Sequence, residues 1–228
     1  MPFDPDLVST VTFDSYSTLV DVDAVETALA SHDSIDDPEP ISRTWRDRSL
    51  QYTFVGTHLE HYEPFYDVLR DALEYALAAH GVETTPEERE ALLEVYHDLR
   101  VFDDVREGLE RLSEAGYDCY VLSNGSPEML ASMVEGAGIG DLLEDTISAH
   151  ELATFKPDPD LYRHAAGRTG TPIQQVAHVS AAWFDVQGAI NAGMQGVWLD
   201  RKGTPWEPFG AEPDLISEGL PGVVELLE

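Results

Sequence analysis

From about residue 97 onward, short apolar segments alternate with amphipathic stretches along the chain. The apolar segments have the length of strands, which we expect at 117–122, 146–148, 176–179 and 196–199. The stretches between them predict helices at 104–115, 127–137, 159–168 and from 185 onward. Strands that alternate with helices predict an α/β fold, a doubly wound parallel sheet of Rossmann type.

One more apolar strand, 8–13, precedes a block of purely helical patterns. The amphipathic stretches of this block lie at 22–33, about 40–57, 62–81 and 85–99. We therefore expect a core domain formed by 1–21 and 97–228, and an inserted helical cap domain formed by 22–96. A helical insertion directly after a strand that carries chemistry is typical of a cap over an active site.

The charge of the chain narrows the range of partners. Asp and Glu number 44 against 13 Lys and Arg, a formal net charge of −31, and the two lysines are Lys156 and Lys202. Such a surface repels nucleic acid and anionic membranes, and high salt screens its self-repulsion. Because the acidic residues are spread along the chain, we expect a salt-adapted cytoplasmic protein; an acidic interaction surface is the alternative. We expect neither a membrane span nor a secretory signal.

The strand 8–13 runs directly into Asp14, a position where α/β folds place their chemistry. Thr18 supplies a hydroxyl four residues later, although both residues are also suited to capping a turn. Tyr16 stands where phosphatases with this motif carry an Asp that protonates the leaving group. Because a phenol does not readily protonate an alkoxide, the pattern favours a nucleophilic Asp14 and a leaving group that needs no proton, such as halide.

Three further strand ends carry polar residues. Ser123 and Asn124 precede a helix and predict an anion site, with an ordinary strand–turn–helix junction as the alternative. Lys156 precedes a proline, which holds it extended and able to direct its ammonium into a cleft. Tyr162 either reaches the same cleft or packs in the core.

The third strand end is the segment 180–185. Ser180 stands where a magnesium phosphatase of this shape has an Asp ligand, so a hard cation loses a main ligand. Asp185 remains, either to activate water or to cap the following helix. We therefore predict neither a metal nor an organic cofactor.

Taken together, these residues resemble the haloacid dehalogenase superfamily, and 13–19 is similar to its L-2-haloacid dehalogenase branch. Segment 45–54 is similar to the cap segment that holds the family's halide- and substrate-contacting arginine, which falls on Arg46. Three further positions match apolar residues that line the family's pocket: Leu50, Phe65 and Phe184. The chain departs from the family at Ser17, usually Gly, and at 181–182, where Ala-Ala replaces the usual Ser-Asn.

The resemblance implies hydrolysis of short (S)-2-haloacids to (R)-2-hydroxy acids and halide. Asp14 would attack C2 to form an ester, Lys156 would keep Asp14 ionised, and Arg46 would receive the halide with the three apolar residues. Asp185, oriented by Ser180 and Lys156, would activate water for ester hydrolysis. The resemblance and the strand-end positions give a predicted substrate-binding set: Thr18, Tyr16, Ser123, Asn124, Tyr162, Leu50, Phe65 and Phe184. A homodimer is a further expectation, and the substrate is a small molecule.

Three alternatives stay open. A magnesium-dependent phosphatase is disfavoured by Tyr16 and Ser180. A non-catalytic relative finds its best support in the Ala-Ala pair at 181–182. A zinc site through His58 and His61 lacks a third ligand nearby, and two histidines at this spacing are more typical of a solvated helix face.

Overall fold

The computed structural model describes residues 3–227 and contains a six-stranded sheet in the order β5–β4–β1–β6–β7–β8. All neighbouring strands in it run parallel. The strands are β1 (Thr10–Phe13), β4 (Asp118–Ser123), β5 (Asp145–Ser148), β6 (Val176–Ser180), β7 (Gln195–Leu199) and β8 (Leu215–Ser217). The predicted doubly wound α/β fold is therefore confirmed, with β1 in the interior of the sheet.

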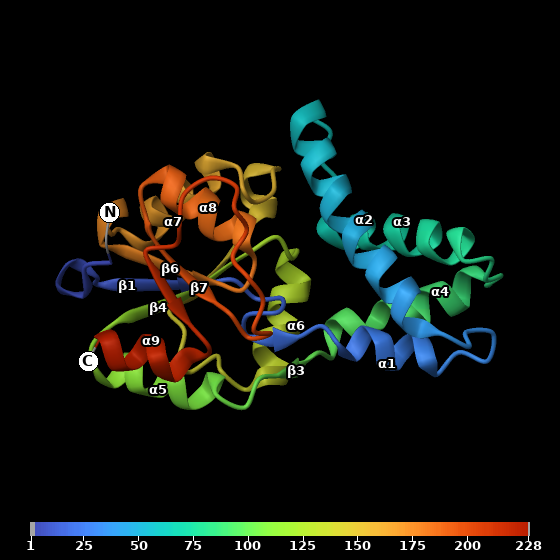
Figure 1. Cartoon of the computed structure of the whole chain (residues 1–228), viewed down its shortest axis with the longest axis horizontal. Coiled ribbons are helices and arrows are strands. Elements are labelled where there is room, and N and C mark those ends of the chain that lie inside the picture. Colours follow the sequence, from blue (N-terminus) through green and yellow to red (C-terminus); the bar gives the residue numbers. More distant parts are fainter. Residues whose placement is uncertain (1–2, 228) are drawn as a thin grey trace.

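Helices cover both faces of this sheet. They are α5 (Val105–Glu114), α6 (Pro127–Ala137), α7 (Pro159–Thr169), α8 (Trp183–Ala192) and α9 (Leu220–Leu227). Figure 1 shows α7 and α8 on one face and α5 and α9 on the other. Because strand side chains alternate, Val11 and Phe13 pack toward Leu109 of α5 and Val223 of α9. Because β1, β4 and β6 run parallel, their C-terminal ends, which carry Asp14, Ser123 and Ser180, lie at the same edge of the sheet.

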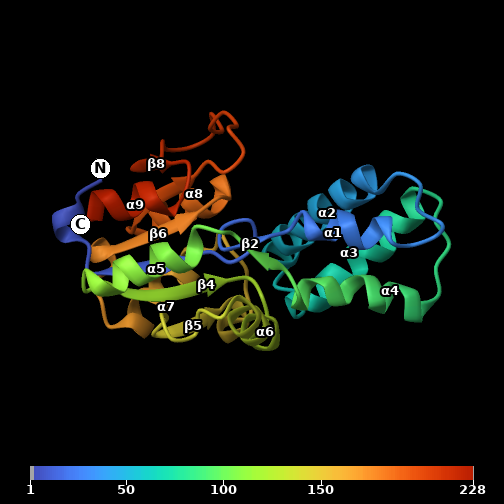
Figure 2. The same cartoon turned by 90° about the horizontal axis from the view of Figure 1, so that it is seen from below.

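Four helices form a second body beside the sheet (Figures 1 and 2). They are α1 (Ala24–Ala30), α2 (Pro38–Leu59), α3 (Phe65–Ala79) and α4 (Pro86–Leu93). Trp45 of α2 is fully buried, and its indole N–H donates to the carbonyl of Leu69 in α3 at 2.8 Å. The buried face of α3 packs in an apolar cluster that continues from this body into the sheet domain, where it includes Met129 and Phe155.

A short ribbon joins the two bodies. β2 (Val20–Asp21) leaves the core and β3 (Arg100–Val101) returns to it, and the two pair antiparallel with Val20 opposite Val101. The insertion therefore departs and returns at one place, next to Asp14. The domain bounds at 22 and 96 stay a prediction.

Side-chain caps mark the starts of several helices. Thr85 accepts from the N–H of Glu88 within a capping box, and Ser126 and Asp158 cap α6 and α7 through their side chains. The 3₁₀ helices are η1 (Pro5–Leu7), η2 (Glu94–His97), η3 (Ala149–Leu152) and η4 (Ile173–Gln175).

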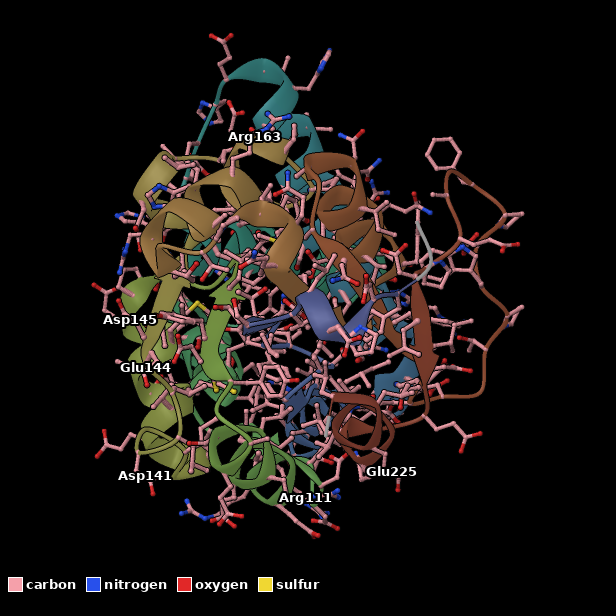
Figure 3. All side chains as sticks on the ribbon, turned by 90° about the vertical axis from the view of Figure 1, so that its left-hand side faces the viewer. Arg111, Asp141, Glu144, Asp145, Arg163 and Glu225 are labelled. Carbon is pink, nitrogen blue, oxygen red and sulfur yellow. The ribbon has the colours of Figure 1, made fainter. Side chains whose placement is uncertain are left out.

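The acidic residues lie mostly at the surface. In Figure 3, Asp141, Glu144, Asp145 and Glu225 stand at the periphery of the molecule, and all four are exposed. Across residues 3–227, no helix is both long enough and apolar enough to cross a membrane.

Candidate active site

Three ionisable side chains meet below the edge where the parallel strands end. Lys156 Nζ lies 2.9 Å from Asp14 Oδ1 and 2.8 Å from Asp185 Oδ2. The exposed fractions of the side chains are 2% for Lys156, 11% for Asp14 and 1% for Asp185. One buried ammonium thus bridges two buried carboxylates, an arrangement that leaves a net negative charge unless a further group compensates it.

The backbone fixes Asp14 at the head of this group. Its N–H donates to the carbonyl of Val179, which continues the β1–β6 pairing by one residue. Thr18 Oγ1 donates to the second carboxylate oxygen of Asp14 at 3.0 Å and accepts from the N–H of Ala181 at 2.9 Å. Both oxygens of Asp14 therefore have a donor, and the carboxylate has a fixed orientation.

The environment moves the pKa values of the two carboxyl groups in opposite directions. Burial raises the pKa of Asp14 above its ordinary value, with Lys156 acting against burial. For Asp185 burial also acts upward, but the charges of His178 and Lys156 outweigh it and hold the pKa well below its usual range. Although burial favours neutral Lys156, its two carboxylate partners raise the pKa of that ammonium. Lys156 therefore stays charged between them.

Asp185 has two further hydrogen-bond donors. Tyr162 of α7 donates its hydroxyl to Asp185 Oδ1 at 2.6 Å, and His178 Nε2 lies 3.0 Å from Oδ2. Ser180 Oγ instead accepts from the N–H of Ala182 at 3.1 Å. The structure thus gives Asp185 the partners Lys156, Tyr162 and His178, whereas the sequence predicted Lys156 and Ser180.

A cavity of about 820 Å³ opens above the carboxylates, between the sheet edge and the helical body. Of the sequence-predicted residues, those that line it are Asp14, Tyr16, Arg46, Leu50, Phe65, Asn124, Lys156, Phe184 and Asp185. Four others do not line it: Thr18, Ser123, Tyr162 and Ser180. Three of them bond to residues that do line it, Thr18 to Asp14, Tyr162 to Asp185 and Ser180 to Ala182, whereas Ser123 bonds to Ser15 and Gly125. Ala181 and Ala182 also line the cavity and present small side chains to it.

Two polar groups in the wall lack a hydrogen-bond partner among the described residues. They are the hydroxyl of Tyr16 and the Nε of Arg46, and both are buried. Tyr16 is held between Phe65 and Tyr96, with ring centroids 5.9 and 5.8 Å away. Unpaired buried donors beside a cavity are suited to a bound anion or polar ligand, because leaving them unpaired costs free energy.

Arg46 brings a positive charge from the helical body to the cavity. Its side chain is 35% exposed, and Nη1 lies 3.7 Å from Asp23 Oδ1. Leu50 and Phe65 of the same body also line the cavity, and Phe184 of the core meets Phe54 edge to face at 5.2 Å. Arg46 thus brings a guanidinium to a mostly apolar part of the wall; Arg201, which also lines the cavity, is paired with Asp104 at 3.1 Å.

The predicted anion site after β4 is partly closed by its own contacts. Ser123 Oγ is buried, lies 2.6 Å from Ser15 Oγ and accepts from the N–H of Gly125. Asn124 Oδ1 accepts from the N–H of Lys156 at 2.9 Å and so ties the two strand-end segments together. Of this pair, Asn124 reaches the cavity.

The backbone at Ser17 is in the left-handed region, with φ of 66°. This conformation favours glycine, the residue expected at this position from the resemblance described above.

Within residues 3–227 we find no group of three or more His, Cys, Asp or Glu side chains placed to hold a metal ion.

This geometry can be compared with known proteins. The family model described as haloacid dehalogenase-like hydrolase matches residues 8–193. The chain belongs to this family of hydrolases. It is 32% identical to (S)-2-haloacid dehalogenase 4A of Burkholderia cepacia, over 92% of each chain.

Solved structures agree with this assignment. The L-2-haloacid dehalogenase RSc1362 superimposes with a TM-score of 0.93 at 31% identity, over 96% of this chain and 98% of that one. The Xanthobacter autotrophicus L-2-haloacid dehalogenase, solved with chloropropionic acid covalently bound, gives a TM-score of 0.87 at 28% identity, again over 96% and 98%. The resemblance stated from the motifs is confirmed at the level of the family.

Sequence reasoning missed His178. It lies within the apolar run of β6, where a histidine is easily taken as part of the core. The available signal was its place two residues before the end of a strand whose tip carries the predicted site.

Proposed function

We propose that this protein hydrolyses the carbon–halogen bond of short (S)-2-haloacids and releases halide and the (R)-2-hydroxy acid. The observation that carries the proposal is the buried Asp14–Lys156–Asp185 group at the floor of a cavity walled by Arg46 and apolar side chains. The covalent chloropropionate complex of the Xanthobacter relative supports a covalent step here as well.

In the first step, a carboxylate oxygen of Asp14 attacks C2 of the substrate from the side opposite the halogen. The C–O bond forms as the C–halogen bond breaks, and the halide leaves with the bonding electron pair. Thr18 and Lys156 hold the two oxygens of Asp14, so the nucleophile meets the substrate in one orientation. The leaving group needs no proton, in keeping with Tyr16 at the position of a phosphatase's acid.

The wall of the cavity receives the two charged parts of the substrate. We propose that Arg46 binds the departing halide among Leu50, Phe65 and Phe184, where a low dielectric strengthens its attraction for an anion. The carboxylate of the substrate would lie against Asn124 and the main chain near Ser17 and Ala181, with the free hydroxyl of Tyr16 close by.

In the second step, water attacks the ester carbonyl of Asp14. Asp185 accepts one proton of that water and passes it to the leaving oxygen as the bond between this oxygen and the carbonyl carbon of Asp14 breaks, so the product leaves as the 2-hydroxy acid. Asp14 returns to its carboxylate form when the second proton of the water is lost to solvent. Because esterification removes the charge of Asp14, Lys156 then faces one carboxylate instead of two. We propose that the helical body acts as a cap domain that excludes bulk water during both steps.

The test is chloride release from L- and D-2-chloropropionate in molar potassium sulfate, with and without EDTA. We expect release from the L substrate, unchanged by EDTA. Asp14→Asn should lower this rate by at least about 10³-fold, since the nucleophile itself is lost. Asp118→Asn, an exposed carboxylate at the opposite end of β4, is the matched control and should retain the rate.

EDTA-sensitive hydrolysis of p-nitrophenyl phosphate without halide release would contradict the proposal. So would a fully active Asp14→Asn variant.

A further inference from the structure

His178 is a buried titratable group that the proposed steps leave unused. It lies in β6 and is fully buried, and in the register of the sheet it stands directly opposite Thr12 of β1. Both ring nitrogens have partners: Nδ1 lies 2.9 Å from Thr12 Oγ1, and Nε2 lies 3.0 Å from Asp185 Oδ2. A histidine that merely filled the core would not need an ionised partner.

The chemistry of the partners fixes the proton on Nε2. The low pKa of Asp185 makes its carboxylate an acceptor, so Nε2 must donate to it. The Thr12 hydroxyl can donate to Nδ1, or it can turn toward the carbonyl of Ala177 at 3.4 Å and accept from Nδ1. Nε2 donates to Asp185 in both arrangements, so the contact does not depend on the charge of the ring.

Asp185 is thereby held by donors from three directions. Lys156 and His178 share Oδ2, and Tyr162 donates to Oδ1, with its ring edge-on to that of His178 at 5.6 Å. Lys156 also contacts Asp14 and belongs to both steps, whereas the hydrogen bonds of His178 go to Asp185 and Thr12. Loss of His178 therefore removes one of the three donors that hold Asp185, while Thr18 and Lys156 still hold Asp14.

We propose that His178 is a positioning residue for Asp185, and that it serves hydrolysis of the ester rather than its formation. This inference rests on the proposed function, in which Asp185 accepts the proton of the attacking water. His178 does not line the cavity, so it acts through Asp185 and not on the substrate.

The experiment separates the two steps. Chloride release from L-2-chloropropionate is followed by quenched flow in potassium sulfate, and the ester on Asp14 is sought by mass spectrometry of the acid-quenched protein. In His178→Phe we expect a burst of one chloride per site at the wild-type rate, then turnover slowed by about 10²-fold with ester accumulating, the size expected from a misplaced catalytic group. His178→Gln, which restores a neutral donor near the position of Nε2, should recover turnover to within about tenfold of wild type.

A second pair of variants tests the contact without removing the ring. Thr12→Val takes away the partner of Nδ1 and should slow turnover by several-fold with an unchanged burst. Thr10→Val, two residues earlier on the same strand and bonded to Thr171 outside the site, should change neither. This pair decides the question if His178→Phe does not fold.

Each outcome bears on one claim. The role of His178 is overturned if His178→Phe turns over at the wild-type rate with an unchanged burst. It is also overturned if the burst and the turnover of this variant are slowed by the same factor. Absence of chloride release from the wild type overturns the proposed function instead.

Discussion

The two lysines of this chain provide a matched test of the buried charge group. Lys156 bridges two buried carboxylates at 2.8 and 2.9 Å, whereas Lys202 pairs with Asp23 at 3.1 Å with both side chains 56% exposed. Removing one partner of a buried ion pair costs about 3–5 kcal/mol, because it leaves an uncompensated charge. An exposed pair contributes about 1 kcal/mol or less.

These free energies translate into melting temperatures. In a domain of this size, each kcal/mol shifts Tm by about 2–4 °C, so Lys156→Met should lower Tm by about 6–20 °C. Lys202→Met should lower it by no more than about 4 °C. Adding Asp14→Asn to Lys156→Met should recover part of the loss, since one of the two carboxyl groups that lost the Lys156 ammonium is then a neutral amide.

The assay is thermal unfolding followed by circular dichroism, with all variants at one potassium sulfate concentration. Equal shifts in Lys156→Met and Lys202→Met would refute the reasoning, as would a double variant less stable than Lys156→Met.

Three further predictions follow from the site and the surface. Asp14 must be ionised to attack, and burial raises its pKa, so the rate of halide release should fall as the pH decreases through that raised value. Thr18→Val removes a hydrogen bond to the ionised form of Asp14 and should therefore move this fall in rate to higher pH. The measurement is the pH profile of halide release in a single turnover. Bromide should inhibit the wild type by binding at Arg46, and in Arg46→Leu its inhibition constant should rise at least about tenfold, the effect of losing a charge-assisted hydrogen bond; an unchanged constant would place the halide elsewhere. Tm should rise between about 0.1 and about 1 M KCl because salt screens a net charge of −31, and a flat dependence would contradict salt adaptation.

The fold was largely predictable because its elements obey local rules. The strand–helix alternation, the capping residues Ser126 and Asp158, and the apolar face of α3 are all short-range patterns. Three features were not predicted: the β2–β3 ribbon, β8 and α9 (Leu220–Leu227). The β2–β3 ribbon consists of two-residue strands with no periodicity, and β8, three residues after a long polar loop, gains its place by pairing with β7.

The site was predictable to the extent that parallel strands bring their ends together. Asp14, Lys156 and Asp185 each follow a strand, and the structure places them in direct contact. The partners of Asp185 were harder to predict, because Tyr162 and His178 reach it from a helix and from within a strand, through distances that sequence spacing does not encode. Ser180, the nearer residue in sequence, bonds to the main chain instead.

The most direct test of the central claim, that Asp14 is the nucleophile, is a single turnover with enzyme in excess over L-2-chloropropionate in ¹⁸O-labelled water. If Asp14 forms an ester that water opens at the carbonyl, the product of this turnover carries unlabelled oxygen and the peptide containing Asp14 gains the label. Labelled product with an unlabelled Asp14 would mean that water attacks C2 directly, which contradicts the account.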